Sequence, residues 1–294
     1  MSAPLLSIAH LNAAFGDGGN VPILRDVSLE VGRGEVHGLV GESGAGKSTI
    51  AKAVLGILPH GIRITGGTIA LEGDDLLNLD AGTRRRRLGA EVALIPQDPL
   101  TALNPGRRIE AQLTDGLRIW RGMGAADARK RALAMLQEVQ MRDPERVMHA
   151  YPHELSGGMR QRVLIAAAFA LEPKLVIADE PTTALDVTVQ KQILRLIRSM
   201  QERHGTGVVF VTHDLGVVAQ ICDRASLLYM GKVMEQGPVS SLLSAPQHSY
   251  TRALMEACPR YDEPGRGLEP VPESVFAACR AEIAAFDRAE AAHG

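Results

Sequence analysis

Residues 41–48 have the sequence Gly41-Glu42-Ser43-Gly44-Ala45-Gly46-Lys47-Ser48, which fits the pattern G-x-x-x-x-G-K-[ST]. They follow an apolar stretch that predicts a strand, and they precede apolar residues at helical spacing. In this context the glycines let the backbone surround phosphate oxygens, and the helix N-terminus supplies unpaired N–H donors. We expect these residues and Thr49 to hold nucleotide phosphates, with Lys47 reaching the β- and γ-phosphates and Ser48 facing Mg²⁺. A glycine-rich turn without a ligand is the disfavoured alternative.

Strands and helices alternate along most of the chain, which predicts an α/β protein with a mostly parallel sheet. A helix is expected from Asp186 to about Arg203, between two apolar strands. Residues 68–71 and 91–95 predict a further strand pair, and the stretches flanking Gly231 predict a closing hairpin. The expected strands lie at 23–31, 36–40, 68–71, 91–95, 174–178, 208–212, 226–230 and 232–235.

Residues 99–158 differ from the rest because apolar side chains recur there at helical spacing. We therefore expect a helical insertion at 99–158 that interrupts a nucleotide-binding core at 1–98 and 159–237, with a β subdomain at its start. A C-terminal extension would occupy 238–294. Prolines near its middle predict a linker, and an Ala-rich helix follows whose apolar side chains pack on this domain or on a partner.

A second candidate element is Leu175-Val176-Ile177-Ala178-Asp179-Glu180, an apolar strand that ends in two carboxylates. Asp179 is suited to hold Mg²⁺ directly or through water, and Glu180 to polarise an attacking water. Taken alone, the segment is explained equally well as a strand that continues into an acidic turn with no catalytic role. The phosphate-binding loop elsewhere in the chain favours the catalytic interpretation.

The segment Leu155-Ser156-Gly157-Gly158-Met159-Arg160-Gln161-Arg162 opens a predicted helix that runs to about Leu171, so it offers a second anion-binding helix N-terminus. With this segment the chain resembles the nucleotide-binding subunits of ATP-binding cassette (ABC) transporters, whose signature is Leu-Ser-Gly-Gly-x. The resemblance implies a P-loop NTPase, RecA-like fold with an N-terminal antiparallel β subdomain and an α-helical insertion. The other matching positions are Phe15 (adenine stacking), Gln97 (Q-loop), Asp186 in Ala184-Leu185-Asp186 (D-loop) and His213 (switch histidine).

Three longer segments are similar to the dipeptide, oligopeptide and nickel uptake branch of this family. They are residues 95–105, 155–162 and 178–190, and residues 246–254 resemble the start of that branch's C-terminal extension. Met159 in the signature favours the first of the branch's two paired ATPases. Some members carry an iron–sulfur cluster in a cysteine-rich tail, but Cys258 and Cys279 stand alone here, so we expect no such cluster.

The resemblance also implies a mechanism in which two ATPase subunits face each other head to tail. The loop and carboxylates of one subunit would clamp ATP and Mg²⁺, while Ser156, Gly157 and Gly158 would close on nucleotide held by the partner. Glu180 would act as the base, His213 would hold water and the γ-phosphate, and Lys47 would offset phosphate charge. Gln97 would link metal occupancy to the helical insertion.

The partners implied are two polytopic permease subunits, a second cassette ATPase and an extracytoplasmic solute-binding protein. A paralogous ATPase is favoured over a second copy of this chain. The subunit would be an ATPase coupled to solute import, peripheral on the cytoplasmic face of the inner membrane. The alternative function is a soluble ABC ATPase that acts on nucleic acid or ribosomes. In transporters of this kind the solute-binding protein and the permease subunits select the cargo.

Composition is compatible with these expectations. The net charge of −2 and the ten aromatic residues argue against a general nucleic-acid binder or a base-stacking surface. The longest apolar run, 163–171, is well short of the roughly 20 residues that span a membrane. Three cysteines are too few for a disulfide framework. The run Arg84–Arg87 is expected to be a solvated helix end rather than a phosphate or lipid patch.

Overall fold

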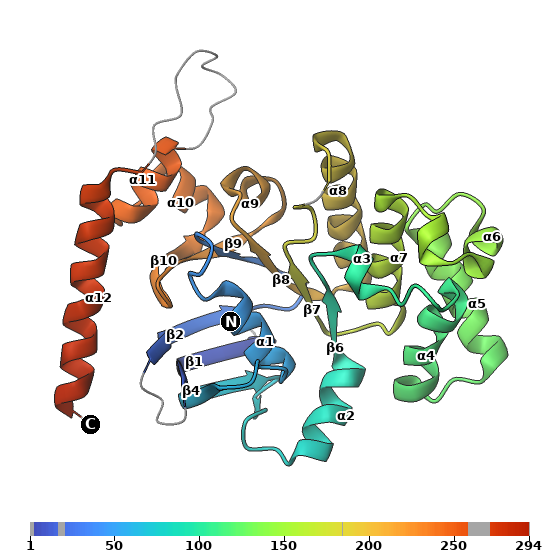
Figure 1. Ribbon diagram of the computed structural model, residues 1–294, viewed down its shortest axis with the longest axis horizontal. Coiled ribbons are helices and arrows are strands. Elements are labelled where there is room, and N and C mark those ends of the chain that lie inside the picture. Colours follow the sequence, from blue (N-terminus) through green and yellow to red (C-terminus); the bar gives the residue numbers. More distant parts are fainter. Residues whose placement is uncertain (1–2, 17–20, 184, 258–270, 294) are drawn as a thin grey trace.

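The computed structural model describes residues 3–16, 21–183, 185–257 and 271–293, and in these ranges the strands form two sheets (Figure 1). The smaller sheet has the order β2-β1-β4-β5 and is antiparallel. The larger has the order β10-β9-β3-β8-β7-β6 and is parallel except for β10. The strand bounds are β1 Leu6–Phe15, β2 Val21–Val31, β3 Val36–Val40, β4 Ile62–Leu71, β5 Asp74–Asp75, β6 Val92–Ile95, β7 Leu175–Asp179, β8 Gly207–Thr212, β9 Arg224–Tyr229 and β10 Lys232–Pro238.

Helices cover the larger sheet and form one end of the molecule, where α3 to α7 gather (Figure 1). The predicted helical character of residues 99–158 is therefore confirmed. The helix bounds are α1 Lys47–Leu55, α2 Ala81–Glu91, α3 Pro99–Ala102, α4 Ile109–Arg121, α5 Ala125–Glu138, α6 Pro144–His149, the 3-10 turn η1 Pro152–Glu154, α7 Gly157–Ala170, α8 Val187–His204, α9 Leu215–Ile221, α10 Val239–Ser244, α11 Ser249–Ala257 and α12 Glu273–His293.

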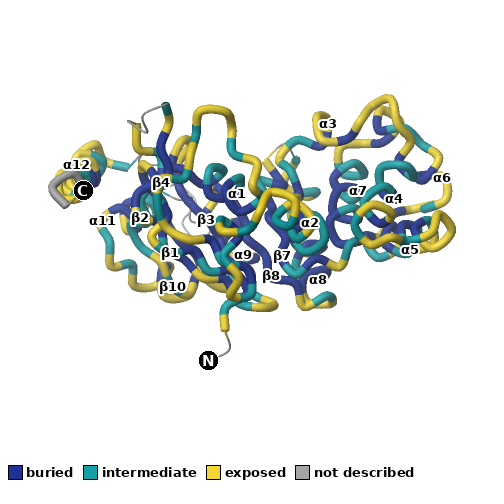
Figure 2. The backbone as a smooth tube through the Cα atoms, turned by 90° about the horizontal axis from the view of Figure 1, so that it is seen from below, coloured by how far each residue is buried: buried dark blue, intermediate teal, exposed yellow. Residues whose placement is uncertain are grey.

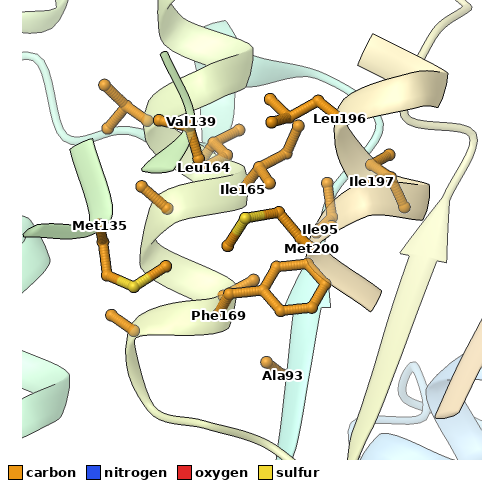
Figure 3. Close-up of a cluster of buried hydrophobic side chains, with 14 of the residues drawn as sticks. Ala93, Ile95, Met135, Val139, Leu164, Ile165, Phe169, Leu196, Ile197 and Met200 are labelled. Atoms are coloured by element: carbon orange, nitrogen blue, oxygen red, sulfur yellow. The ribbon is translucent and has the colours of Figure 1, made fainter. Parts of the chain in front are cut away.

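Alternate side chains of the central strands enter two different cores. Val176 and Ala178 of β7 pack with α7 and α8, whereas Leu175 and Ile177 pack with α1 and the smaller sheet. This division follows from the two-residue period of a strand, which sends successive side chains to opposite faces. Figure 3 shows the first core, where Phe169 of α7, Met200 of α8 and Ile95 of β6 converge. Figure 2 shows the central strands as the most buried part of the molecule.

The predicted pairing of residues 68–71 with 91–95 is wrong. Strand β4 pairs with β1 in the smaller sheet, while β6 pairs with β7 in the larger one. An apolar pattern identifies a strand but does not specify its partner. The hairpin predicted around Gly231 is confirmed by the antiparallel pairing of β9 with β10.

The arginine run 84–87 lies within α2 rather than at a helix end. Arg87 is mostly buried and bonds to Asp74, Glu91 and the carbonyl of Leu71, so the expectation of full solvation is wrong for this residue. No helix in the described ranges is both long and apolar enough to cross a membrane.

The Ala-rich helix of the tail is α12, and it packs on its own chain. Cys279 and Ile283 are buried against Tyr229 of β9 and Tyr250 of α11. Helix α12 lies at the opposite end of the molecule from α4 to α6 (Figures 1 and 2). The predicted linker and Cys258 lie within residues 258–270, outside the described residues.

Candidate active site

The candidate residues follow the carboxyl ends of neighbouring parallel strands. The phosphate loop (residues 41–48) follows β3, His213 follows β8, and Gln97 follows β6. Asp179 is the last residue of β7, with Glu180 next to it. Because the strand order is β3-β8-β7-β6, these ends lie side by side. Open α/β sheets bind ligands at this edge.

Glycine is required at two positions of the phosphate loop. Gly46 precedes α1 with φ +101°, and a Cβ there would come within 2.9 Å of the Leu24 side chain. At Gly41, with φ +154°, a Cβ would lie 2.3 Å from the carbonyl oxygen of Leu228. No side chain caps α1, so the first-turn N–H groups have no acceptor within the helix. The residues of that turn line a cavity, to which they offer anion-binding donors.

Lys47 is held by the loop that it follows. Its Nζ donates to the carbonyl oxygens of Gly41 at 2.6 Å and Glu42 at 2.8 Å, and the residue is only 5% exposed. Burial lowers the pKa of Lys47, while the charges of Glu180, Asp179 and Glu42 oppose that shift. An ammonium group has three donors, so one remains for a phosphate oxygen.

Ser48, which lines the cavity, contacts Asp179 at the end of β7. The Ser48 hydroxyl donates to Asp179 Oδ1 at 3.3 Å. Burial raises the pKa of Asp179, the Ser48 hydrogen bond lowers it, and the charge of Glu180 raises it further. The pair thus gathers hydroxyl and carboxylate oxygens next to the phosphate loop.

Glu180 is the centre of a polar cluster. Its Oε2 accepts hydrogen bonds from Gln97 Nε2 at 3.2 Å and Thr183 Oγ1 at 2.9 Å, and it lies 3.3 Å from His213 Nδ1. The backbone of Glu180 has φ +45°, an uncommon conformation for a residue with a side chain. Strain of this kind is concentrated at functional sites. It is held here by the bond from the Glu180 N–H to the Val211 carbonyl at 3.0 Å.

A cavity of about 660 Å³ unites these groups. Its volume lies within the range of roughly 300–1,000 Å³ that ligand pockets have. The predicted residues that line it are Gly41, Glu42, Ser43, Gly44, Gly46, Lys47, Ser48, Thr49, Gln97, Glu180 and His213. Ala45 and Asp179 are not among the lining residues. Ala45 stands between Gly44 and Gly46 in the sequence, and Asp179 accepts a hydrogen bond from Ser48.

Other predicted residues lie away from the cavity wall. Phe15 ends β1, is 51% exposed and faces Gly61, where a Cβ would approach its ring to 2.8 Å. Asp186 caps α8 by accepting from the N–H groups of Thr188 and Val189. Ala184 of the predicted D-loop lies outside the described residues. Ser156 and Gly157 are exposed at the start of α7, and Gly158 is half-buried.

Sequence reasoning missed Thr183 and the apolar wall of the cavity. Thr183 donates to Glu180 from three residues further along, a spacing visible in the sequence but without a motif to mark it. The missed apolar residues are Ile23, Val40, Leu215 and Leu254. Leu254 comes from α11, and no local pattern predicts that the C-terminal extension reaches this cavity.

Family models place this geometry among known proteins. The model described as "ABC transporter" matches residues 24–183, more than half of the chain. The chain belongs to the ABC transporter family. A model described as "Oligopeptide/dipeptide transporter, C-terminal region" matches residues 234–283 of this ABC chain. A third, described as an AAA domain and putative AbiEii toxin, overlaps at residues 149–219.

Similar ABC proteins include the probable D,D-dipeptide transport ATP-binding protein DdpD of Escherichia coli (strain K12), 46% identical over 94% of this chain and 84% of that one. The dipeptide transport ATP-binding protein DppD of Bacillus subtilis (strain 168) is 43% identical over 91% and 80%. A dimeric ABC cassette, MJ0796, bound to ADP and Pi, matches with TM-score 0.69 and 28% identity over 80% and 98%. The predicted family and P-loop NTPase fold are thus confirmed, and the chain is an ATPase subunit that couples hydrolysis to transport.

Proposed function

We propose that this chain is the ATP-hydrolysing subunit of an importer for peptides or a related small solute. The observation that carries the proposal is the convergence of the phosphate loop, the Asp179–Glu180 pair and His213 on one cavity. The similarity to ATP-binding proteins named for dipeptide transport, and the match at residues 234–283, support peptides as the solute class. Nickel and opine-like solutes remain within the same branch.

ATP binding rests on the phosphate loop and its surroundings. The N–H groups of the loop and of the first turn of α1 bind phosphate oxygens, and Lys47 offsets the charge of the β- and γ-phosphates. Phe15, exposed at the end of β1, stacks on the adenine. Ile23 lines the cavity and adds an apolar contact.

Hydrolysis depends on the cluster around Glu180. Water attacks the γ-phosphorus, the bond from that phosphorus to the β–γ bridging oxygen breaks, and the proton of the water passes to Glu180. Gln97, Thr183 and His213 hold the Glu180 carboxylate in place through Oε2. The other ring nitrogen of His213 binds the γ-phosphate.

The residues also fit Mg²⁺. In the described residues no group of three or more His, Cys, Asp or Glu side chains could form a complete metal site. Mg²⁺ in nucleotide sites is usually held by one or two carboxylates together with phosphates and water. Ser48, Asp179 and the amide oxygen of Gln97 would hold it here. When bound, Mg²⁺ neutralises charge on the phosphates.

The signature completes the site of another subunit. Ser156, Gly157 and Gly158 present the N-terminus of α7 on the surface, and none of them lines this chain's own cavity. They would bind the γ-phosphate of nucleotide held by a second cassette ATPase, with Asp186 close to the same interface. A paralogue is favoured as that subunit. ATP binding would close the pair, and product release would reopen it.

Each part of the chain has its own role in the proposed importer. Residues 1–98 and 159–237 form the nucleotide-binding core, 99–158 carry the helical subdomain that meets the permeases, and 238–294 form the extension. Two polytopic permease subunits and an extracytoplasmic solute-binding protein complete the importer. The chain would lie on the cytoplasmic face of the inner membrane.

Co-purification tests the proposal. The tagged chain is isolated from native membranes in mild detergent, and its companions are identified by mass spectrometry. Two polytopic membrane proteins and a second ABC ATPase are expected. Recovery with ribosomes or nucleic acid, and without membrane proteins, would contradict the transport proposal and favour the alternative class of soluble ABC ATPases.

A further inference from the structure

The C-terminal extension reaches the nucleotide cavity. Leu254 of α11 lines the cavity. It also packs on a cluster that contains Val40, the residue before the phosphate loop, and Leu215, two residues after His213. The extension is therefore in contact with both segments that carry the catalytic groups.

Tyr250 of α11 lies directly behind the phosphate loop. It is fully buried, and its hydroxyl donates to the carbonyl of Leu228 at 3.5 Å. The backbone of Glu42 also lies close to this hydroxyl. The same Leu228 carbonyl would lie 2.3 Å from a Cβ at Gly41, so little space separates the loop from Tyr250.

These contacts bear on Lys47. The two carbonyls that hold its Nζ belong to Gly41 and Glu42, the residues next to the Leu228 carbonyl and the Tyr250 hydroxyl. A displacement of Tyr250 would change the direction of those carbonyls. The ammonium group of Lys47 would then move, because it is hydrogen-bonded to both.

Helix α12 holds α11 in this position. Tyr250 packs with Cys279 and Ile283, and the ring of Phe276 lies 6.5 Å from its ring. His248 joins the two helices, because its Nδ1 accepts from the Tyr250 N–H at 3.1 Å and its Nε2 lies 3.2 Å from Glu282. Glu235 of β10 accepts from the N–H groups of Gln247 and His248 and fixes the start of α11.

A second path links α12 to the loop. Asp287 accepts two hydrogen bonds from Arg25, at 2.8 and 3.2 Å, and Arg25 also donates to the Met230 carbonyl at 2.6 Å. The next residue, Gly231, donates its N–H to the carbonyl of Ala45 in the phosphate loop at 2.9 Å. Arg25 is only 9% exposed, so its charge depends on Asp287 for compensation.

We propose that Tyr250 is a positioning residue for the phosphate loop, and that docking of α12 onto α11 and Arg25 is coupled to ATP binding. The inference rests on the proposed role of the cavity in ATP binding. Coupling of this kind is reciprocal, since whatever strengthens ATP binding through α12 must also strengthen docking of α12 when ATP binds.

The first test measures ATP affinity of the full chain with Tyr250→Phe, which keeps the ring and removes the hydroxyl. One neutral hydrogen bond predicts a dissociation constant about 2- to 10-fold higher. In the assembled transporter, the KM of Tyr250→Phe for ATP is expected to rise by a similar factor, while kcat stays within about twofold. The reason is that a positioning contact made in both the ground state and the transition state affects KM alone. Tyr151→Phe is the matched control, in a tyrosine outside the cavity.

The second test uses α12. Asp287→Asn weakens ATP binding by a factor within the same range of about 2–10, whereas Glu290→Gln, the same chemical change on an exposed residue of α12, leaves it unchanged. Cys279 is 1% exposed, so a thiol reagent reaches it only after α12 moves away. With Cys222 and Cys258 replaced by Ala and with Glu180→Gln to prevent turnover, ATP is expected to slow labelling of Cys279.

The outcomes separate the two proposals. If the wild-type chain binds no ATP, the nucleotide site itself is refuted and the inference with it. If the wild type binds ATP and Tyr250→Phe binds it equally well, the positioning role of Tyr250 is overturned. If Asp287→Asn binds ATP as tightly as the wild type, or ATP leaves Cys279 labelling unchanged, the coupling to α12 is overturned. In both cases the proposed nucleotide site stands.

Discussion

The cavity and the signature are two regions that we propose to bind anions, and they are built in opposite ways. The cavity is enclosed by segments from distant parts of the sequence, and its Lys47 and Glu180 are mostly buried and hydrogen-bonded. The signature, by contrast, is one exposed helix start. Ser156 Oγ caps α7 by accepting from the Met159 N–H at 3.4 Å, and a Cβ at Gly157 would meet open space.

This difference shows which functions one chain can perform alone. A preorganised cavity binds its ligand with little rearrangement, because its donors are already fixed. An exposed helix N-terminus offers donors on one side only, so it needs a second surface to enclose an anion. We infer that ATP binding belongs to the single chain and that hydrolysis requires two chains.

The largest expected effect separates chemistry from binding within the cavity. Glu180→Gln keeps the size of the side chain and removes the base, so kcat of the assembled transporter is expected to fall by about 10²- to 10⁴-fold. ATP affinity of the isolated chain should stay within about twofold, as expected for a group that acts only in the transition state. Glu30→Gln, on an exposed position of β2, is the control. Turnover close to that of the wild type would exclude Glu180 as the base.

The second-largest effect is expected on the binding of ATP in the cavity. Lys47→Ala removes the buried ammonium, and ATP affinity of the isolated chain is expected to fall by about 10- to 100-fold, as for a charge-assisted hydrogen bond. Titration with a fluorescent ATP analogue measures this. Lys191→Ala, on an exposed position of α8, is the control. Unchanged affinity of Lys47→Ala would contradict the assignment of the phosphate site.

A smaller effect is expected at the residue that the sequence alone did not reveal. Thr183→Val removes the hydroxyl that donates to Glu180 and keeps the branched shape, so kcat should fall by about 2- to 10-fold. Thr188→Val, exposed near the start of α8, should have no effect. If both variants hydrolyse ATP equally fast, Thr183 does not orient the base.

The smallest effect is on stability. Because burial raises the pKa of Asp179, the folded chain binds this proton more tightly than the unfolded chain does. Ionised Asp179 therefore costs stability at neutral pH, and this cost disappears as pH falls below the unfolded pKa of about 3.9.

Asp179→Asn should thus raise the Tm of the nucleotide-free chain at pH 7 to 8, by about 2–4 °C for each kcal/mol regained, and the gain should shrink on acidification. Asp80→Asn is the contrasting variant. Hydrogen bonds from Thr83 and Gly82 lower the pKa of Asp80, so removing its charge should give no gain. A gain from Asp179→Asn that does not depend on pH would contradict the electrostatic explanation.

The sequence predicted those parts of the site that lie in continuous motifs. The phosphate loop and the end of β7 are recognisable because a glycine pattern and an apolar strand are local signals. It failed where the outcome depends on long-range packing. Residues 68–71 and 91–95 were paired wrongly because their partners, β1 and β7, lie far away in the sequence. The contact of Leu254 with the cavity depends on how α11 packs, which no local pattern records.

Gly157→Asp tests whether the signature acts on nucleotide held by a second chain. The new carboxylate enters open space at the first position of α7, where it suits the helix dipole, so the fold should be retained while an anion is repelled. Gly157→Asn is the neutral control of the same size. ATP affinity of the isolated chain is measured, together with the ATP retained after gel filtration by complexes in which Glu180 is Gln and the partner ATPase carries the same change at its own catalytic base.

Isolated Gly157→Asp is expected to bind ATP as tightly as the wild type, while the complex that contains it is expected to retain less ATP than the one with Gly157→Asn. Loss of ATP binding by the isolated variant would mean that the signature acts on nucleotide held by its own chain. Full retention of ATP by the complex would mean that the signature does not contact nucleotide at all. Either result would contradict the division of labour between the cavity and the signature.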